Sequence, residues 1–459
     1  MKLKKNQIIT VAVEDITNLG FGVARHDGEV IFISGAVPGD RVAAKIIKVA
    51  SSYAVARVEE FITRSGERDA SRCSLACRAC AYRELTYARE LTLKRELVAS
   101  AFKKAGLTDI KIRDLTPSPA VCGYRNKAQY PVSRERHGEY IIGFYAPKSH
   151  RVTEAASCPL APSVFAELLE LLRAYFERHE ISVYDEKTHT GLLRHVYIRR
   201  GEVSGEILLT LVINGDSLPY SDELVTLVCE SFPAVVGILL NVNTADTNVV
   251  LGDEYITLFG RDYIFDTLAG VRLKITAPSF YQVNREAAEL LYLKARELAE
   301  LRPGDTLLDL YCGAGSIGLS MAEDAGELIG IEIVESAVEC ARENATANGI
   351  KNAAFYAGDA ADSARLLDVA ERTRGEKISP DVVILDPPRA GSDERLLRYI
   401  ARLSPRKIVY ISCNPTTLAR DVKVLAECGY EAGEVWPFDL FPMTGHVESV
   451  VCLKRRLDN

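Results

Sequence analysis

Residues 307–318 read LLDLYCGAGSIG, a short apolar stretch that runs directly into a glycine-rich turn. The apolar part has the length and composition of a buried strand. The glycines let the backbone approach a ligand closely, because side chains there would clash with it. Dinucleotide-dependent oxidoreductases share this pattern, and so do simple packing turns, so the turn alone leaves its function open.

The rest of the C-terminal half alternates regularly between helical segments and short apolar runs. This alternation predicts a doubly wound, Rossmann-like α/β domain, which we place at residues 271–459. Two last strands are separated by a short loop and predict an antiparallel edge of the sheet. The apolar runs are residues 307–310, 328–331, 353–356, 382–385 and 408–411, and the two last strands are near 430–437 and 448–453.

The N-terminal part shows a different periodicity. Residues 7–61 alternate polar and apolar side chains in five short runs that turns interrupt. This pattern predicts a small closed β-barrel of the OB-like kind over residues 1–62, a shape that often binds oligonucleotides. Residues 63–270 are mixed, and we predict a central α+β domain there with a cysteine cluster and a helix near 84–105.

Composition restricts the class of protein. The 459 residues are 47% hydrophobic and 26% charged, with no apolar run of membrane-spanning length, so we expect no membrane association. The basic first residues precede no apolar core, which argues against a secretory signal. The eleven cysteines are therefore interpreted as thiols or metal ligands of a cytoplasmic protein. Residues 120–152 concentrate basic and aromatic side chains, typical of a nucleic-acid surface or of a solvated sheet face.

Three polar side chains should meet at the carboxyl edge of the predicted sheet. Asp386 and Cys413 end the fourth and fifth strands, and Glu448 begins the antiparallel last strand. A thiolate that adds to an electron-poor ring activates the neighbouring ring carbon toward an electrophile, and a base must then remove the proton from that carbon. Cys413 suits the nucleophile, Glu448 the base, and Asp386 a contact that holds the ring. The alternatives are a buried structural cysteine and an exposed edge carboxylate.

Residues at the ends of the neighbouring strands indicate which ligand the glycine turn binds. Glu332 ends the second strand, and Asp386-Pro387-Pro388-Arg389 ends the fourth. Together with the turn they resemble a class I S-adenosylmethionine-dependent methyltransferase. In that resemblance the turn with Tyr311 and Gly313 carries the methionine end, Glu332 the ribose and Asp359 the adenine. Asp359 by itself also fits a helix N-cap.

Further motifs extend the resemblance over essentially the whole chain. They are Ser279-Phe280-Tyr281-Gln282-Val283-Asn284, the turn at 309–315, Asp386-Pro387-Pro388-Arg389, Ser412-Cys413-Asn414-Pro415, Gly445-His446-Val447-Glu448 and Tyr124-Arg125-Asn126-Lys127. With these motifs the chain resembles the RNA uracil-C5 methyltransferase family, in particular its branch that acts on 23S ribosomal RNA.

This resemblance implies a set of roles and partners. Gln282, Tyr311, Glu332 and Asp386 would contact S-adenosylmethionine, Cys413 would be the nucleophile, and Glu448 would be the proton acceptor. The N-terminal barrel would be a TRAM domain that binds RNA. The expected partner is 23S ribosomal RNA, and we predict no protein partner.

The resemblance also implies four cysteine ligands for a [4Fe–4S] cluster. They are Cys73, Cys77, Cys80 and Cys158. Four thiolates hold structural zinc equally well, so zinc and the absence of a metal stay open as alternatives. The sequence also departs from the family pattern, because only three residues separate Cys73 from Cys77 and Arg78-Ala79 replaces the common Gly-Gly.

Three other functions remain to be weighed. The tRNA branch of the same family typically lacks the barrel and the cysteine cluster. RNA cytosine-C5 methyltransferases place a cysteine directly after Asp-Pro-Pro, where this chain has Arg389. A non-catalytic RNA-binding or redox-sensing protein on the same scaffold would not need Gln282, Cys413 and Glu448.

Overall fold

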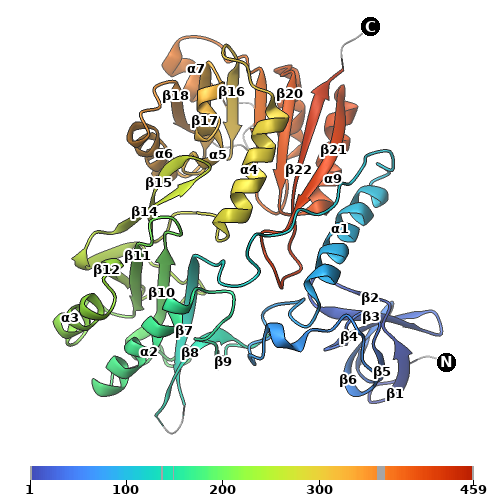
Figure 1. Cartoon of the computed structure of the whole chain (residues 1–459), viewed down its shortest axis with the longest axis vertical. Coiled ribbons are helices and arrows are strands. Elements are labelled where there is room, and N and C mark those ends of the chain that lie inside the picture. The colour runs from blue at the N-terminus through green and yellow to red at the C-terminus, as the bar shows by residue number, and fades with distance from the viewer. Residues whose placement is uncertain (1–2, 136–137, 148, 359–366, 457–459) are drawn as a thin grey trace.

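The computed structural model describes residues 3–135, 138–147, 149–358 and 367–456. It confirms the predicted architecture: an N-terminal barrel, a mixed central domain and a C-terminal Rossmann-like domain, each built on its own sheet (Figure 1). No helix in these ranges is long and apolar enough to cross a membrane.

The N-terminal sheet curls into a barrel because its two edge strands are consecutive in the chain. The strand order is β1-β5-β6-β4-β3-β2, and β1 and β2 follow one another directly in the chain. The described part contains one strand beyond the prediction, β2, which is too short to produce a periodicity in the sequence. The strands are β1 (Ile8–Ala12), β2 (Asp15–Ile16), β3 (Phe21–His26), β4 (Glu29–Ser34), β5 (Arg41–Val49) and β6 (Tyr53–Thr63).

The helix that follows the cysteine segment packs on the C-terminal domain rather than on the central sheet. After η1 (Ala70–Arg72), the chain forms α1 (Tyr87–Lys104), whose N-cap Thr86 accepts a hydrogen bond from the Arg89 N–H. Val98 and Phe102 of α1 belong to the same core cluster as residues of α9 (Pro415–Glu427). Figure 1 shows α1 running beside α9. The predicted domain boundaries after residues 62 and 270 stay a prediction.

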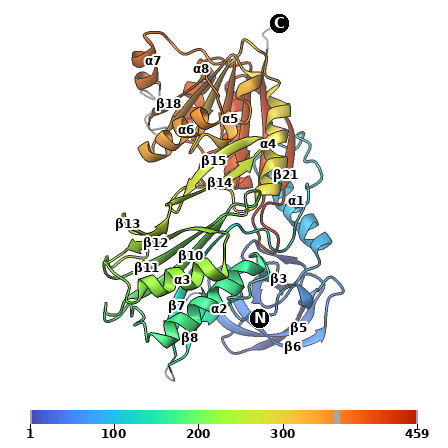
Figure 2. The ribbon, with the colours of Figure 1, turned by 60° about the vertical axis from the view of Figure 1, so that its left-hand side comes forward.

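The central sheet has the strand order β13-β12-β11-β10-β7-β8-β9. Helices α2 (Ser163–Arg178) and α3 (Ser221–Ser231) lie along one of its faces (Figure 2). The hairpin of β14 (Tyr263–Leu268) and β15 (Val271–Thr276) then leads into the C-terminal domain. The sheet strands are β7 (Lys127–Arg134), β8 (Tyr140–Tyr145), β9 (Val152–Glu154), β10 (Leu193–Arg200), β11 (Ile207–Ile213), β12 (Val235–Val242) and β13 (Glu254–Gly260).

The C-terminal sheet has the order β18-β17-β16-β19-β20-β22-β21, in which β22 runs antiparallel to both of its neighbours. The strands are β16 (Thr306–Leu310), β17 (Glu327–Glu332), β18 (Ala353–Ala357), β19 (Val382–Leu385), β20 (Lys407–Ser412), β21 (Tyr430–Phe438) and β22 (Glu448–Arg455). The helices are α4 (Arg285–Ala299), α5 (Ser316–Leu319), η2 (Ala322–Asp324), α6 (Glu335–Ala347), α7 (Asp368–Arg374), α8 (Glu394–Arg402) and α9.

Both faces of the central strands β19 and β20 are buried, which explains why their interiors are apolar. Successive residues of one strand enter different cores: Leu307 joins the cluster that contains α4 and α6, and Leu308 joins the cluster that contains α1, α8 and α9. Polar residues are therefore concentrated where the strands end. That edge holds the candidate site.

Candidate active site

A pocket of about 820 Å³ opens at the carboxyl edge of the C-terminal sheet. This volume is within the range of cofactor-binding sites. The pocket brings together every predicted catalytic and cofactor-binding residue that the structure describes: Gln282, Tyr311, Gly313, Glu332, Asp386, Cys413 and Glu448. The remaining predicted contact, Asp359, lies outside the described residues.

The glycine turn is shaped by a buried carboxylate beneath it. Asp309 Oδ2 accepts a hydrogen bond of 2.9 Å from the Gly318 N–H. A side chain at Gly318 would come within 2.7 Å of that oxygen, which explains the glycine. Burial raises the pKa of Asp309 to about 7. Tyr311 has a φ of +64°, a left-handed conformation that costs energy for a residue with a side chain and is typical of functional turns.

Glu332 is held against this turn by two backbone donors. Its Oε2 accepts from the Gly313 N–H and its Oε1 from the Val334 N–H, each at 3.0 Å. The pocket therefore combines a carboxylate suited to hydroxyl groups with the bare backbone of Gly313 and with the apolar Ile333 and Pro387. This set of groups fits a nucleoside with a flexible polar tail, such as S-adenosylmethionine.

The segment that carries Gln282 is fixed from two directions. The Gln282 carbonyl accepts a hydrogen bond of 2.8 Å from Asn126 Nδ2. Asn284 Nδ2 donates to Ser118 Oγ and to the Leu440 carbonyl, each at 3.0 Å. The wall of the pocket is thus joined to the central domain and to the loop before Glu448.

Strand pairing places Cys413 close to Glu448. Ser412 of β20 pairs with Ser449 of β22, so the residues just outside this pair share one edge of the sheet. Asn414 caps α9 by accepting from the Thr416 N–H at 3.0 Å, and its Nδ2 donates to the Arg389 carbonyl at 3.0 Å. The Asp386–Arg389 turn is therefore tied to the cysteine.

The site favours the protonated forms of Asp386, Cys413 and Glu448. Burial raises the pKa of Glu448 well above its usual range, and the charge of Asp386 raises it further. Burial raises the pKa of Asp386 to about 7. The pKa of Cys413 is raised to about 11, first by burial and then by Glu448 and Asp386, while Arg389 acts in the opposite direction. Once ionised, Glu448 is a stronger base than an ordinary carboxylate.

Further side chains line the pocket that the sequence had not assigned a role. They are Lys127, Phe280, Arg389, Phe441 and His446. Burial, followed by the charges of Arg199 and Arg125, lowers the pKa of Lys127 to about 8. Each lies within or near a recognised motif except Phe441, which no pattern in the sequence marks.

The four candidate metal ligands surround a second pocket, of about 470 Å³, that shares Lys127 and His446 with the first. All four are free thiols, and burial, followed by the charge of Cys158, raises the pKa of Cys80 to about 12. Among the described residues, however, no three His, Cys, Asp or Glu side chains converge closely enough to hold a metal ion. The structure therefore does not support the predicted metal site, although it gathers the thiols around one cavity.

The fold and the first pocket together define a Rossmann-like methyltransferase. Comparison with known sequences supports this class. The family model described as tRNA (Uracil-5-)-methyltransferase matches residues 86–456, and the TRAM domain model matches residues 2–58. The chain belongs to the tRNA (uracil-5-)-methyltransferase family and carries an N-terminal TRAM domain. This confirms the predicted uracil-C5 methyltransferase family and the TRAM domain, whereas the 23S ribosomal RNA branch stays a prediction.

Relatives match over nearly their full length. An uncharacterized RNA methyltransferase of Halalkalibacterium halodurans is 38% identical over 98% of both chains. One of Bacillus cereus is 39% identical over 99% of this chain and 98% of its own. Among solved structures, the Pyrococcus abyssi tRNA (uracil-54, C5)-methyltransferase in complex with S-adenosyl-L-homocysteine superposes with a TM-score of 0.78 at 27% identity, over 97% of this chain and 100% of its own.

Proposed function

We propose that this chain transfers a methyl group from S-adenosylmethionine to C5 of a uridine in RNA, with Cys413 as nucleophile and Glu448 as base. The observation that carries the proposal is the composition of the pocket. One part presents Gln282, Gly313 and Glu332 for the methyl donor, and the other presents Cys413 and Glu448 for the base to be modified.

The residues of the site support each step of this reaction. S-adenosylmethionine supplies an electrophilic methyl group. After its proton has passed to solvent, the Cys413 thiolate adds to C6 and moves the electron pair of the C5–C6 double bond toward the C4 carbonyl. C5 then bonds to the methyl carbon, whose bond to sulfur breaks. Glu448 takes the proton from C5, the double bond forms again, and the bond between C6 and the Cys413 sulfur breaks.

The environment of the Cys413 thiol explains why the thiolate would form only after RNA has bound. In the open pocket Cys413 is held in its neutral form by burial and by two carboxyl groups. Lys127, with its lowered pKa, and Arg389 line the same pocket and can meet the negative charge that develops on the uracil carbonyls. We assign Asp386 to hold the ring.

We propose 23S ribosomal RNA as the target, in a cytoplasmic setting. The support is the sequence resemblance to the ribosomal branch of the family. tRNA is the second candidate, because the Pyrococcus abyssi tRNA methyltransferase superposes on 97% of this chain. That extent includes part of the barrel, so the presence of a barrel does not by itself separate the ribosomal branch from the tRNA branch.

The deciding experiment is methyl transfer from labelled S-adenosylmethionine to unmodified 23S ribosomal RNA and to a tRNA pool, followed by nucleoside mass spectrometry. 5-Methyluridine in 23S RNA alone supports the full proposal. 5-Methyluridine in tRNA alone would support the proposed reaction but would show that the target is tRNA rather than 23S RNA. No methylated product in either RNA, from protein that binds S-adenosylhomocysteine, would favour the non-catalytic RNA-binding alternative.

We further propose that Cys73, Cys77, Cys80 and Cys158 bind a [4Fe–4S] cluster, with zinc as the alternative. The support is the resemblance of these four cysteines to the cluster ligands of the family, to which the structure adds only that all four thiols are free and line one cavity. The proposed methyl transfer needs no electron from such a cluster, so its role would be structural or RNA-positioning. Iron and sulfide analysis with visible absorbance tests it, against zinc analysis of the same anaerobically purified protein. Protein free of both metals would refute the site.

A further inference from the structure

The loop between β21 and β22, residues 439–447, forms part of the active-site wall without regular secondary structure of its own. Phe441 and His446 of this loop line the pocket, with their ring centroids 5.9 Å apart in an edge-to-face arrangement. Glu448 follows directly as the first residue of β22. Because the loop belongs to no helix or strand ladder, its backbone groups must find partners elsewhere.

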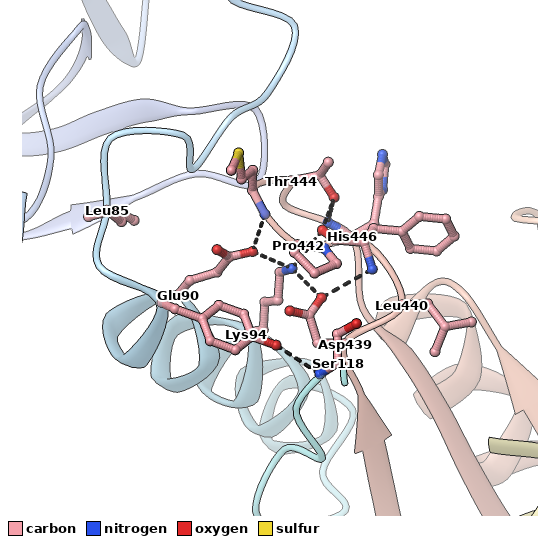
Figure 3. Close-up of polar contacts among 12 residues, drawn as sticks. Leu85, Glu90, Lys94, Ser118, Asp439, Leu440, Pro442, Thr444 and His446 are labelled. Atoms are coloured by element: carbon pink, nitrogen blue, oxygen red, sulfur yellow. Dashed lines mark hydrogen bonds and ion pairs between the residues drawn. The ribbon is translucent and has the colours of Figure 1, made fainter. Parts of the chain in front are cut away.

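A group of buried charges lies against this loop (Figure 3). Lys94 Nζ of α1 is 2.7 Å from Glu90 Oε1 and 2.7 Å from Asp439 Oδ1, and all three side chains are fully shielded from solvent. Arg72 Nη1 lies 2.8 Å from the other oxygen of Glu90. We refer to Arg72, Glu90, Lys94 and Asp439 as the buried tetrad. Two cations offset two anions, so every charge in it is paired.

The buried tetrad also binds the backbone of the loop. Lys94 Nζ donates to the Phe441 carbonyl at 3.0 Å, and Asp439 Oδ1 accepts from the Phe441 N–H at 3.1 Å. Glu90 Oε1 accepts from the Met443 N–H at 2.7 Å. Met443 has a φ of +68°, a left-handed conformation that a non-glycine residue adopts only when its surroundings hold it there. The charges therefore hold a strained loop in one conformation.

We propose that the buried tetrad positions Phe441, His446 and Glu448 for catalysis, an inference that rests on the function proposed above. Glu90, Lys94 and Asp439 do not line the pocket, so they act as positioning residues. A purely stabilising role is a weaker explanation, because well-packed apolar side chains often replace a buried ion pair without loss of stability. Apolar side chains would not supply the three hydrogen bonds to the loop backbone.

The test uses the paired substitution Lys94→Met with Asp439→Asn, which removes one charge of each sign and leaves Arg72 paired with Glu90. We expect kcat to fall about tenfold or more, as for a misplaced general base. The KM for S-adenosylmethionine should stay unchanged, and the methylated Cys413–RNA adduct should accumulate on denaturing gels. The control is Arg296→Met with Asp324→Asn, a partly exposed ion pair of the C-terminal domain whose residues do not line the pocket, and this variant should keep its kcat.

Amide hydrogen exchange of residues 440–446 supplies a readout that does not depend on activity. Exchange should be faster in the Lys94→Met, Asp439→Asn protein and unchanged in the control. A folded variant with wild-type kcat and wild-type exchange would overturn the inference. If that variant does not fold, Glu90→Gln is measured in the same two ways. If the wild-type protein makes no 5-methyluridine, the proposed function fails, while the exchange data still decide whether the tetrad holds the loop.

Discussion

The thiol of Cys413, the proposed nucleophile, is held in its neutral form partly by Glu448 and Asp386, which are proposed to act with it. Burial and two carboxyl groups raise the pKa of Cys413 to about 11, against the opposing effects of Arg389 and of a hydrogen bond from the backbone at Cys413. We therefore expect Cys413 of the free protein to react slowly with oxidants and alkylating agents. Contact with the uracil ring and with the methyl donor must then favour the thiolate.

Alkylation of Cys413 should therefore depend steeply on pH. The thiolate is the reacting species, so the rate with iodoacetamide should rise about tenfold for each unit between roughly pH 7 and pH 10. In Glu448→Gln the pKa of Cys413 should fall, because the carboxylate that disfavours the thiolate is gone. Alkylation should therefore be faster at every pH at which Glu448 is ionised in the wild-type protein. Mass spectrometry of the Cys413 peptide measures this, with Cys340 as the internal control. An unchanged rate in Glu448→Gln would contradict the electrostatic account.

Substitutions of the two proposed catalytic residues, Cys413 and Glu448, should block the reaction at different steps. Cys413→Ala should lose methyl transfer entirely, because C5 is not activated without the thiolate, yet it should still bind S-adenosylhomocysteine in calorimetry. Glu448→Gln should retain the attack and the methyl transfer but lack the base, so a covalent RNA adduct should accumulate. Substantial turnover by Cys413→Ala would refute covalent catalysis. Rapid release of product by Glu448→Gln would assign proton removal to another group.

At the scale of the element, the turn from β16 to α5 depends on one buried hydrogen bond. Asp309 Oδ2 receives the Gly318 N–H, and no water can replace it at a site with no exposed surface. Asp309→Ala removes the acceptor, at a cost of about 1–3 kcal/mol. The Kd for S-adenosylhomocysteine should rise about tenfold or more. Asp309→Asn keeps an acceptor and should bind with nearly wild-type affinity, and equal losses in both variants would contradict this role.

At the scale of the whole molecule, the barrel is docked through a small apolar cluster and a buried ion pair. Ile16 and Val37 of the barrel pack against Leu93 of α1. Asp40 Oδ2 lies 2.5 Å from Arg68 Nη2, and its oxygens also accept from the N–H groups of Val37 and Ser65. The TRAM domain is thereby held beside the loop that carries His446.

This ion pair predicts an acid dependence of stability. Burial by itself raises the pKa of Asp40, but hydrogen bonds from Arg68, Val37 and Ser65 outweigh it and leave the pKa below 3.8. A lowered pKa adds stability that is present above about pH 4 and is lost as the pH falls through the folded value. Asp40→Ala should lose about 1–3 kcal/mol near neutral pH, because it leaves the N–H groups of Val37 and Ser65 without their acceptor. The loss is limited because Arg68 keeps its second carboxylate partner, Glu84. Denaturant unfolding at several pH values measures both effects, and an Asp40→Ala protein as stable as wild type would refute them.

The sequence by itself determined the sheet and the edge where chemistry collects. Short runs such as Val382–Leu385 are apolar at every position, and this local pattern is sufficient to predict a buried strand. The polar residues that end such runs, Asp386 and Cys413, could therefore be assigned to one pocket with Glu448. Their roles stay predictions, and Asp359 lies outside the described residues.

Only the tertiary structure decided which distant segments support that pocket. Lys94 and Asp439 are 345 residues apart, and their contact leaves no periodicity that a sequence pattern could reveal. The same holds for Phe441, which lies in a loop without a motif. The raised pKa of Cys413 also depends on burial by residues from several elements. A local sequence pattern predicts which face of a helix or strand is buried. Which other element packs against that face is decided only when the chain folds.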